Sequence, residues 1–176
     1  MFRLILCFMF LMSFFQSNYA QIVSKELVKQ IIEDNKDVSD YIKNSKMSIS
    51  EVIKELKASK VDLNSDGNPE YIIFGLICGQ NCSHWIYQKD GSKFIQIPFE
   101  GWGAYLSLDL LKTKTKGYRD LLGTVFLNCC EEGLETYKFN GFKYVIGKCL
   151  IKTYGYTDTR GKYHTYKKPK IEKCSK

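Results

Sequence analysis

The sequence predicts an α+β fold in which two N-terminal helices pack on an antiparallel β-meander or small sandwich. Helical periodicity of apolar residues is confined to residues 21–60. Short β-branched and aromatic runs, separated by turn residues, fill residues 61–151, and a basic segment or terminal hairpin follows over 152–176. Helices that precede the strands, rather than alternating with them, are typical of α+β domains with the helices on one side of the sheet.

The first element is an export signal over residues 1–20. Arg3 precedes an apolar run from Leu4 to Phe15, and a polar stretch ends at Ala20, which is the order of a secretory signal peptide. The run is shorter than the roughly 20 residues that a membrane-spanning helix needs. We therefore expect a secreted or periplasmic mature chain, residues 21–176, that forms one disulfide-stapled domain without a membrane span.

Two amphipathic helical segments are expected next. The first has apolar residues near helical spacing and a break around Asn35. The second places Ser48 three residues before Glu51, the pattern of a capping box at a helix start. Both helices should therefore lie against an apolar surface.

The β-rich region repeats itself at an offset of 50 residues. The offset pairs Gly67 with Gly117, Glu70 with Asp120, Tyr87 with Tyr137, Gly91 with Gly141 and Phe94 with Tyr144. Each block runs from loop to acidic residue, strand, cysteine-bearing bend, strand, glycine turn and strand, which predicts a duplicated β-hairpin unit. Two copies are too few to close a propeller, which takes about four to eight blades. A curved sheet or a small sandwich is the expected outcome.

The stretch "VDLNSDGNPEY" alternates oxygen-bearing side chains around a glycine. The candidate metal ligands are Asp62, Asn64, Asp66, Asn68 and Glu70. Carboxylate and amide oxygens in a tight loop are what a hard cation such as Ca²⁺ prefers. An EF-hand is excluded because its twelfth position, which needs a bidentate glutamate, is Ile73. The alternative is a polar turn without metal, since Asn, Asp, Gly and Pro are the ordinary turn residues.

Residues 62–74, "DLNSDGNPEYIIF", resemble the calcium-binding loop of FG-GAP (VCBS-type) β-repeats, which runs directly into a strand. The resemblance implies a structural calcium ion, with side-chain ligands from Asp62, Asn64, Asp66 and Glu70 and a backbone ligand from Asn68. Glu70 departs from the more usual aspartate. At the 50-residue offset, Lys112, Lys114 and Lys116 replace Asp62, Asn64 and Asp66. The second copy therefore could not hold a cation.

The chain also resembles small exported bacterial proteins of unassigned function that combine such a loop with a later "YxFxGxxY" strand pair. Here that pair is "YKFNGFKY", from Tyr137 to Tyr144. This resemblance implies no particular activity.

Six cysteines remain after removal of the signal. They are Cys78, Cys82, Cys129, Cys130, Cys149 and Cys174. An even number in an oxidising compartment predicts disulfides. Cys78 and Cys82 are close enough to close a single turn. The neighbours Cys129 and Cys130 are expected to go to two different partners, with Cys149 and Cys174 as the candidates.

The excess positive charge lies at the C-terminus. Without Arg3 the chain has 25 basic and 19 acidic residues, and the net +6 is the same as that of the last 25 residues. Interleaved tyrosines there could bind an acidic protein or a polyanionic envelope. A solvated hairpin turning at "TDTRGK" is the alternative, and export makes nucleic acid the least suitable partner.

No catalytic signature is present: the sequence has no phosphate-binding glycine loop, no Ser-His-Asp elbow and no H-E-x-x-H. We therefore expect an exported, non-enzymatic binding or structural module with one calcium-type loop. One alternative is a secreted or periplasmic inhibitor or immunity protein against a cell-wall hydrolase or toxin. The other is a hydrolase, in which Glu70, Glu131, Glu132 or His84 would have to line a pocket.

Overall fold

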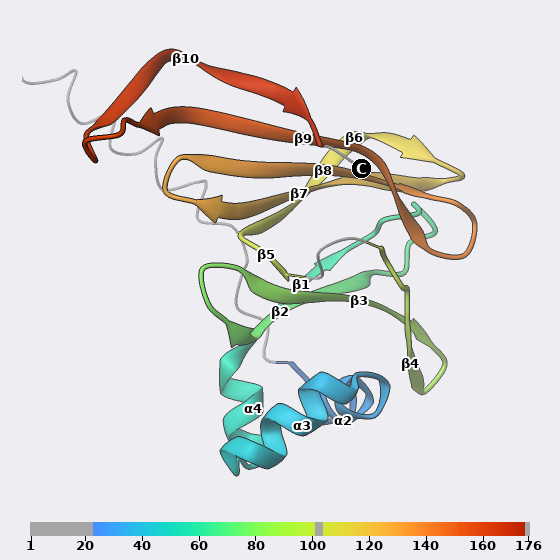
Figure 1. Ribbon diagram of the computed structural model, residues 1–176. Helices are drawn as coiled ribbons and strands as arrows, with labels where there is room; N and C mark the ends of the chain where they lie inside the picture. The colour runs from blue at the N-terminus through green and yellow to red at the C-terminus, as the bar shows by residue number, and fades with distance from the viewer. Residues whose placement is uncertain (1–22, 101–103, 175–176) are drawn as a thin grey trace, which may run out of the picture.

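The computed structural model describes residues 23–100 and 104–174 (Figure 1). The predicted export signal lies outside these residues. Three helices, α2 (Lys25–Asp34), α3 (Lys36–Ser45) and α4 (Ile49–Glu55), precede two antiparallel five-stranded sheets in the described part of the chain. The predicted α+β class is confirmed. No helix in this part is both long and apolar enough to cross a membrane.

The helix boundaries follow the predicted signals. Ser24 caps α2 by accepting a hydrogen bond from the Leu27 N–H at 3.2 Å. Asn35 has an extended backbone and separates α2 from α3, where the sequence predicts a break. The capping box of Ser48 and Glu51 is formed at the start of α4.

The expected helical range, residues 21–60, is too long. Helix α4 ends at Glu55, and Leu56–Val61 forms strand β1, which pairs with β2. Leu56 and Ala58 are buried in the core beneath the helices, whereas the side chain of Lys57 is exposed. This alternation with a period of two, together with a neighbouring strand that satisfies the backbone, overrides the local helical pattern.

The strands form two separate sheets. Sheet A contains β1, β2 (Glu70–Cys78), β3 (Cys82–Asp90) and β4 (Lys93–Gln96) in that order, with β5 (Ala104–Tyr105) also paired to β3. Sheet B contains β6 (Ser107–Thr115), β7 (Tyr118–Asn128), β8 (Glu131–Phe139), β9 (Tyr144–Thr157) and β10 (Tyr163–Lys173) in sequence order.

The predicted duplication extends to the strand register. In the first repeat, β1–β4, the paired residues include Ser59 with Ile72, Tyr71 with Tyr87, and Tyr87 with Gln96. In the second repeat, β6–β9, they include Asp109 with Leu122, Leu121 with Tyr137, and Tyr137 with Ile146. Each pair of the second set lies 50 residues after its counterpart. The duplicated unit is therefore a four-stranded meander.

The two repeats stack in the same orientation. Each repeat has two faces. We define face 1 as the face that carries Tyr87 in the first repeat and Tyr137 in the second, and face 2 as the opposite face. Face 1 of the first repeat packs against the helices. Its face 2, which carries Ile72 and Ile86, packs on Leu121 and Tyr137, which belong to face 1 of the second repeat. Figure 1 shows the resulting order of helices, sheet A and sheet B.

Candidate functional site

The predicted metal loop forms a tight turn held by its own backbone. The Asp62 carboxylate accepts hydrogen bonds from the N–H groups of Ser65, Asp66 and Gly67 at 2.6, 3.2 and 3.0 Å. Gly67 has φ +87°, a left-handed conformation that glycine adopts without strain. Asp62 therefore organises the turn whether or not a cation is bound.

Asn64 and Asp66 complete this network. The Asn64 side chain donates to the Asp66 carboxylate at 2.9 Å, and the Asp66 carboxylate also accepts from the Asn68 N–H at 2.7 Å. These bonds, the one from Asn68 most of all, lower the pKa of Asp66. The loop thus brings together Asp62, Asn64 and Asp66 as the sequence predicts, with their oxygens engaged by amide groups.

Glu70 lies at the base of the loop, where β2 begins. Its side chain is 2 % exposed and accepts a hydrogen bond from the Leu63 N–H at 2.7 Å. Burial raises the pKa of Glu70, and the nearby charges of Asp66 and Asp62 raise it further. Among the described residues, no group of three or more His, Cys, Asp and Glu side chains is arranged to hold a metal ion. Calcium binding here stays a prediction.

The end of β6 and the start of β7 in the second repeat lie against the acidic loop of the first repeat. The Arg119 N–H donates to the Leu63 carbonyl at 2.8 Å, and Asn64 donates to the Tyr118 hydroxyl at 3.2 Å. Lys114 Nζ donates to Ser65 Oγ at 2.5 Å. The fold therefore places a cationic side chain of one repeat beside the acidic turn of the other.

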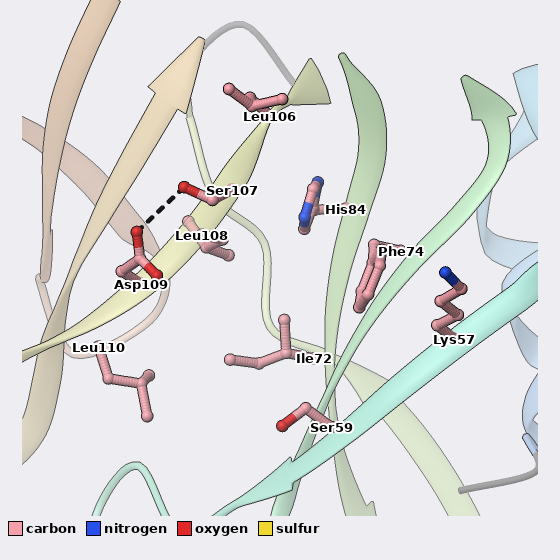
Figure 2. A pocket seen from close by; sticks show the side chains of 10 residues that line it. All are labelled: Lys57, Ser59, Ile72, Phe74, His84, Leu106, Ser107, Leu108, Asp109 and Leu110. Atoms are coloured by element: carbon pink, nitrogen blue, oxygen red, sulfur yellow. Dashed lines mark hydrogen bonds between the residues drawn. The ribbon is translucent and has the colours of Figure 1, made fainter. Parts of the chain in front are cut away.

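A cleft of about 390 Å³ opens between sheet A and strand β6 (Figure 2). It is lined by Lys57, Ser59, Ile72, Phe74, His84, Leu106, Ser107, Leu108, Asp109 and Leu110. His84 is 6 % exposed and stacks on Phe74 with ring centroids 5.4 Å apart. Burial lowers the pKa of His84, so the imidazole is neutral near pH 7.

The polar groups of this cleft do not form a catalytic triad. His84 Nδ1 donates to the Cys82 carbonyl at 2.8 Å, and the Asp109 carboxylate accepts from Ser107 Oγ at 3.0 Å. A triad would need the carboxylate on the histidine and the histidine on the serine. Of the four acid–base candidates taken from the sequence, His84 alone lines this cleft; Glu70, Glu131 and Glu132 do not. Sequence inspection missed Ser107 and Asp109 because only the stacking of the sheets brings β6 near His84.

The disulfides differ in part from the expectation. Cys78 pairs with Cys82, as predicted, and Cys149 pairs with Cys174. The expected pairing of Cys129 and Cys130 with those two partners is therefore wrong. The physical reason is the register of β9 and β10, which brings the Cys174 N–H within 3.2 Å of the Cys149 carbonyl. Cys129 and Cys130 instead form the bend between β7 and β8.

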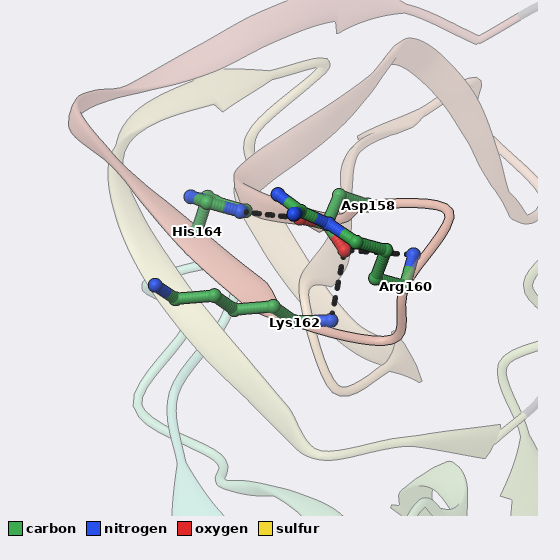
Figure 3. A network of polar contacts seen from close by, with 4 residues as sticks. All are labelled: Asp158, Arg160, Lys162 and His164. Carbon is green, nitrogen blue, oxygen red and sulfur yellow. Dashed lines mark hydrogen bonds and ion pairs between the residues drawn. The ribbon is translucent and has the colours of Figure 1, made fainter.

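The basic C-terminal segment is the hairpin β9–β10, turning at residues 158–162. Asp158 organises this turn by accepting from the N–H groups of Arg160 and Lys162, each at 3.0 Å, and by bonding His164 Nε2 at 3.0 Å (Figure 3). The bond with His164 is the main cause of the lowered pKa of Asp158. The turn is therefore defined rather than a loose tail.

Cations and aromatic rings alternate on this hairpin. Lys152 Nζ lies 4.7 Å from the Tyr154 ring centre, and Lys170 Nζ lies 4.4 Å from that of Tyr166. Tyr156 stacks on His164 at 5.0 Å and is 49 % exposed. Tyrosine is enriched in protein interfaces, so the exposed rings of this hairpin are suited to contact a partner.

Face 2 of the second repeat is the outer face of sheet B. It carries Leu122, Thr124, Phe126, Leu134, Thr136 and Leu150, which alternate with the buried residues of face 1. All six are partly exposed, whereas the counterparts of Leu122 and Thr136 in the first repeat, Ile72 and Ile86, are 6 % and 0 % exposed. In the register of β8, β9 and β10, Lys148, Lys152 and Lys173 lie on the same face.

Comparison of the chain with protein-family models, with curated proteins and with solved structures finds no match in any of the three.

Proposed function

We propose that the chain is an exported, non-enzymatic binding module whose partner is an acidic protein that docks on the outer face of sheet B. One observation carries this proposal. Face 2 is buried between the sheets in the first repeat, whereas the apolar centre of the same face in the second repeat belongs to neither of the two buried core clusters of the described residues.

Stacked repeats need a cap at each end. Each repeat buries its apolar faces only against a neighbour, so terminal repeats require a covering element or a polar outer surface. Helices α2, α3 and α4 cover the first end of this stack. The second end presents Leu122, Leu134 and Leu150 on a sheet. A partner that covers these leucines would supply the missing cap.

Charge indicates the chemistry of the partner. Lys148, Lys152 and Lys173 share the face with the leucines, and the register also places Glu132 and Asp109 on it. Most of the excess positive charge therefore comes from the adjoining hairpin, which also adds exposed tyrosines. Two copies of this face would bring like charges together, which costs free energy in an interface. An acidic protein surface with a small apolar centre fits better, and export would place that partner in the envelope or outside the cell.

The acidic loop would have an architectural part in this module. It joins β1 to β2 and contacts the start of β7 through Leu63 and Asn64. A calcium ion bound by Asp62, Asn64, Asp66, Asn68 and Glu70 would therefore fasten the first repeat to the second, and it would need no role in chemistry.

A second candidate function, inhibition of an extracellular hydrolase or toxin, is favoured by one loop. Phe142 is 75 % exposed at the tip between β8 and β9. Asn140 Oδ1 accepts from the N–H groups of Phe142 and Lys143 at 2.9 and 3.0 Å, which holds the tip in one conformation. A preorganised loop with a protruding aromatic residue loses little entropy on entering a cleft.

Three single variants distinguish these functions. The immobilised chain would be exposed to envelope and culture-medium proteins, and the captured proteins identified for the wild type, Leu134→Asp, Phe142→Ala and the control Ile95→Asp. Ile95 is 43 % exposed and lies in β4, which belongs to sheet A and not to sheet B. We expect Leu134→Asp alone to abolish capture of an acidic protein, and capture to weaken as salt is raised.

Loss of capture in Phe142→Ala alone would favour the inhibitor. If no variant changes the captured set, or if nothing is captured, the proposal is wrong. Circular dichroism of each variant shows whether the fold is retained.

A further inference from the structure

Two adjacent thiols lie at the tip of the β7–β8 hairpin. Among the described residues, Cys129 and Cys130 are the cysteines outside the two disulfides, and their Sγ atoms are 2.6 Å apart. Cys129 is exposed and Cys130 is buried. We propose that this pair is a thiol–disulfide exchange site, oxidised by low-molecular-weight disulfides to a bond between adjacent cysteines and reopened by thiols.

The duplication sets this bend apart from its counterpart in the first repeat. In the first repeat, the bend between β2 and β3 is closed by the Cys78–Cys82 disulfide. The counterparts of these positions in the second repeat are Asn128 and Glu132. The second repeat thus has its two cysteines inside the bend, where they have each other as the nearest sulfur.

Adjacency makes this bond easier to reduce than an ordinary disulfide. Consecutive Cα atoms are about 3.8 Å apart, whereas disulfides favour Cα separations of about 4.4 to 6.8 Å. The Cα atoms of Cys149 and Cys174 are 5.4 Å apart, within that range. A bond between Cys129 and Cys130 would therefore be strained, and strained disulfides have more oxidising potentials than relaxed ones.

The bend is fixed by neighbours on three strands. Asn128 Oδ1 accepts from the Cys130 N–H at 2.9 Å, and the Tyr154 N–H donates to the Cys130 carbonyl at 2.8 Å. Glu131 accepts from Asn128 Nδ2 at 2.8 Å and from Thr153 Oγ1 at 3.3 Å. Because the second thiol is held beside the first, the step that closes the ring is intramolecular.

The proposed thiol–disulfide exchange proceeds in two steps. The Cys129 thiolate attacks a disulfide RSSR, forms a mixed disulfide with one RS group and expels RS⁻, which takes up the proton that Cys129 lost. Cys130 then loses its proton, attacks the Cys129 sulfur and expels the second RS⁻, which becomes RSH. Two protein thiols are oxidised, and one RSSR is reduced to two RSH. The hydrogen bond with Cys130 raises the pKa of Cys129, so the first step should quicken as pH rises and more thiolate forms.

The test is a redox titration of the purified chain in mixtures of reduced and oxidised glutathione, with thiols trapped by alkylation and peptides analysed by mass spectrometry. We expect the peptide containing Cys129 and Cys130 to lose two hydrogens on oxidation. It should become alkylated in less reducing mixtures than the Cys149 and Cys174 peptides. Cys130→Ser should instead retain one glutathionyl group on Cys129, because no second thiol can expel it.

The double variant Cys78→Ser/Cys82→Ser is the matched control, since it removes the disulfide from the equivalent bend and should leave this behaviour unchanged. The proposal is overturned by any of three results: both thiols remain alkylatable in fully oxidised glutathione, the pair opens together with Cys149–Cys174, or oxidation yields disulfide-linked dimers.

Discussion

In the first repeat, the turn before the second strand carries Asp62, Asn64 and Asp66, and in the second repeat the same positions carry three lysines. The first repeat begins its second strand with Glu70, which is bonded to the Leu63 N–H. The second repeat has Asp120 there, 3 % exposed, and Asp120 Oδ1 has no hydrogen-bond partner among the described residues. The strand register is nevertheless the same in both repeats.

The repeats also differ in what packs against face 1. Trp85 and Tyr87 of the first repeat pack beneath the helices. Their counterparts in the second are Glu135 and Tyr137, and both the Tyr137 and Tyr105 hydroxyls donate to the Glu135 carboxylate. Apolar alternation and turn glycines therefore preserve the backbone arrangement in both repeats, whereas the polar side chains differ according to the surface that each repeat packs against.

The largest expected effect on stability comes from changing the size of a buried side chain on face 1. Ile73 is fully buried beneath the helices. Its counterpart Gly123 leaves room for the Tyr105 ring, which would lie only 2.8 Å from a Cβ atom added at that glycine. Ile73→Ala should lower the free energy of unfolding by about 2–5 kcal/mol, measured by urea denaturation. Gly123→Ala should cost about 1–3 kcal/mol through overpacking.

Ile95→Ala is the control for this pair, because Ile95 is 43 % exposed and surface changes stay within about 0.5 kcal/mol. A cost for Ile73→Ala as small as that of Ile95→Ala would show that the helices do not pack on sheet A as described.

Calcium should stabilise the protein through the acidic turn of the first repeat, which has no acidic counterpart in the second. At a concentration 100 times its dissociation constant, a cation bound only by the folded state adds about 2.7 kcal/mol of stability. Thermal unfolding should therefore shift upward with calcium relative to chelator, and Asp66→Ala should remove the shift. Protons compete for Glu70, whose pKa is raised by burial, so the shift should shrink as pH falls toward the ordinary glutamate value of 4.5.

Asp109→Ala is the control for calcium, since Asp109 lies in β6 outside the acidic loop. If calcium leaves the unfolding midpoint of the wild type unchanged, the loop is a polar turn, and the resemblance to calcium-binding repeats has no functional meaning.

Removing the hydroxyl group should lower stability more at Tyr137 than at its counterpart Tyr87, and both losses should be smaller than that of Ile73→Ala. Tyr137→Phe removes one of the two tyrosine hydroxyls that donate to the buried Glu135 side chain and leaves Tyr105 as the other donor. Weakening the hydrogen bonding of a buried polar group in this way costs about 1–3 kcal/mol. Tyr87→Phe removes a hydroxyl that accepts from Asn35 Nδ2 at 3.1 Å, a bond worth about 1 kcal/mol. Denaturation midpoints would measure both, and a larger loss for Tyr87→Phe would contradict the described network.

The smallest expected effect is a change in pH dependence at His84, where the second repeat has Leu134. Burial lowers the pKa of His84 below its ordinary value of 6.5, so below pH 6.5 the unfolded chain binds more protons than the folded one. Stability should therefore be complete above pH 6.5 and decline as pH falls toward the folded-state pKa. His84→Leu should remove this decline, and an unchanged pH profile in that variant would assign it to other groups.

Much of the N-terminal half of the chain follows from local sequence. Three features depend on residues only a few positions apart and can be predicted without knowledge of the fold. They are the helix break at Asn35, the capping box of Ser48 and Glu51, and the Cys78–Cys82 bend. The end of α4 could not be placed in the same way, because Leu56–Val61 is a strand only where β2 supplies its hydrogen bonds.

The amino-acid sequence by itself determined the α+β class, the 50-residue duplication and the conformation of the acidic turn, because period, turn chemistry and capping act over short distances along the chain. Only the tertiary structure decided that Cys149 pairs with Cys174, that β6 joins His84 at a cleft, and that face 2 of the second repeat faces outward. These depend on how two sheets stack and where a hairpin returns, which are set by packing between residues far apart in the chain.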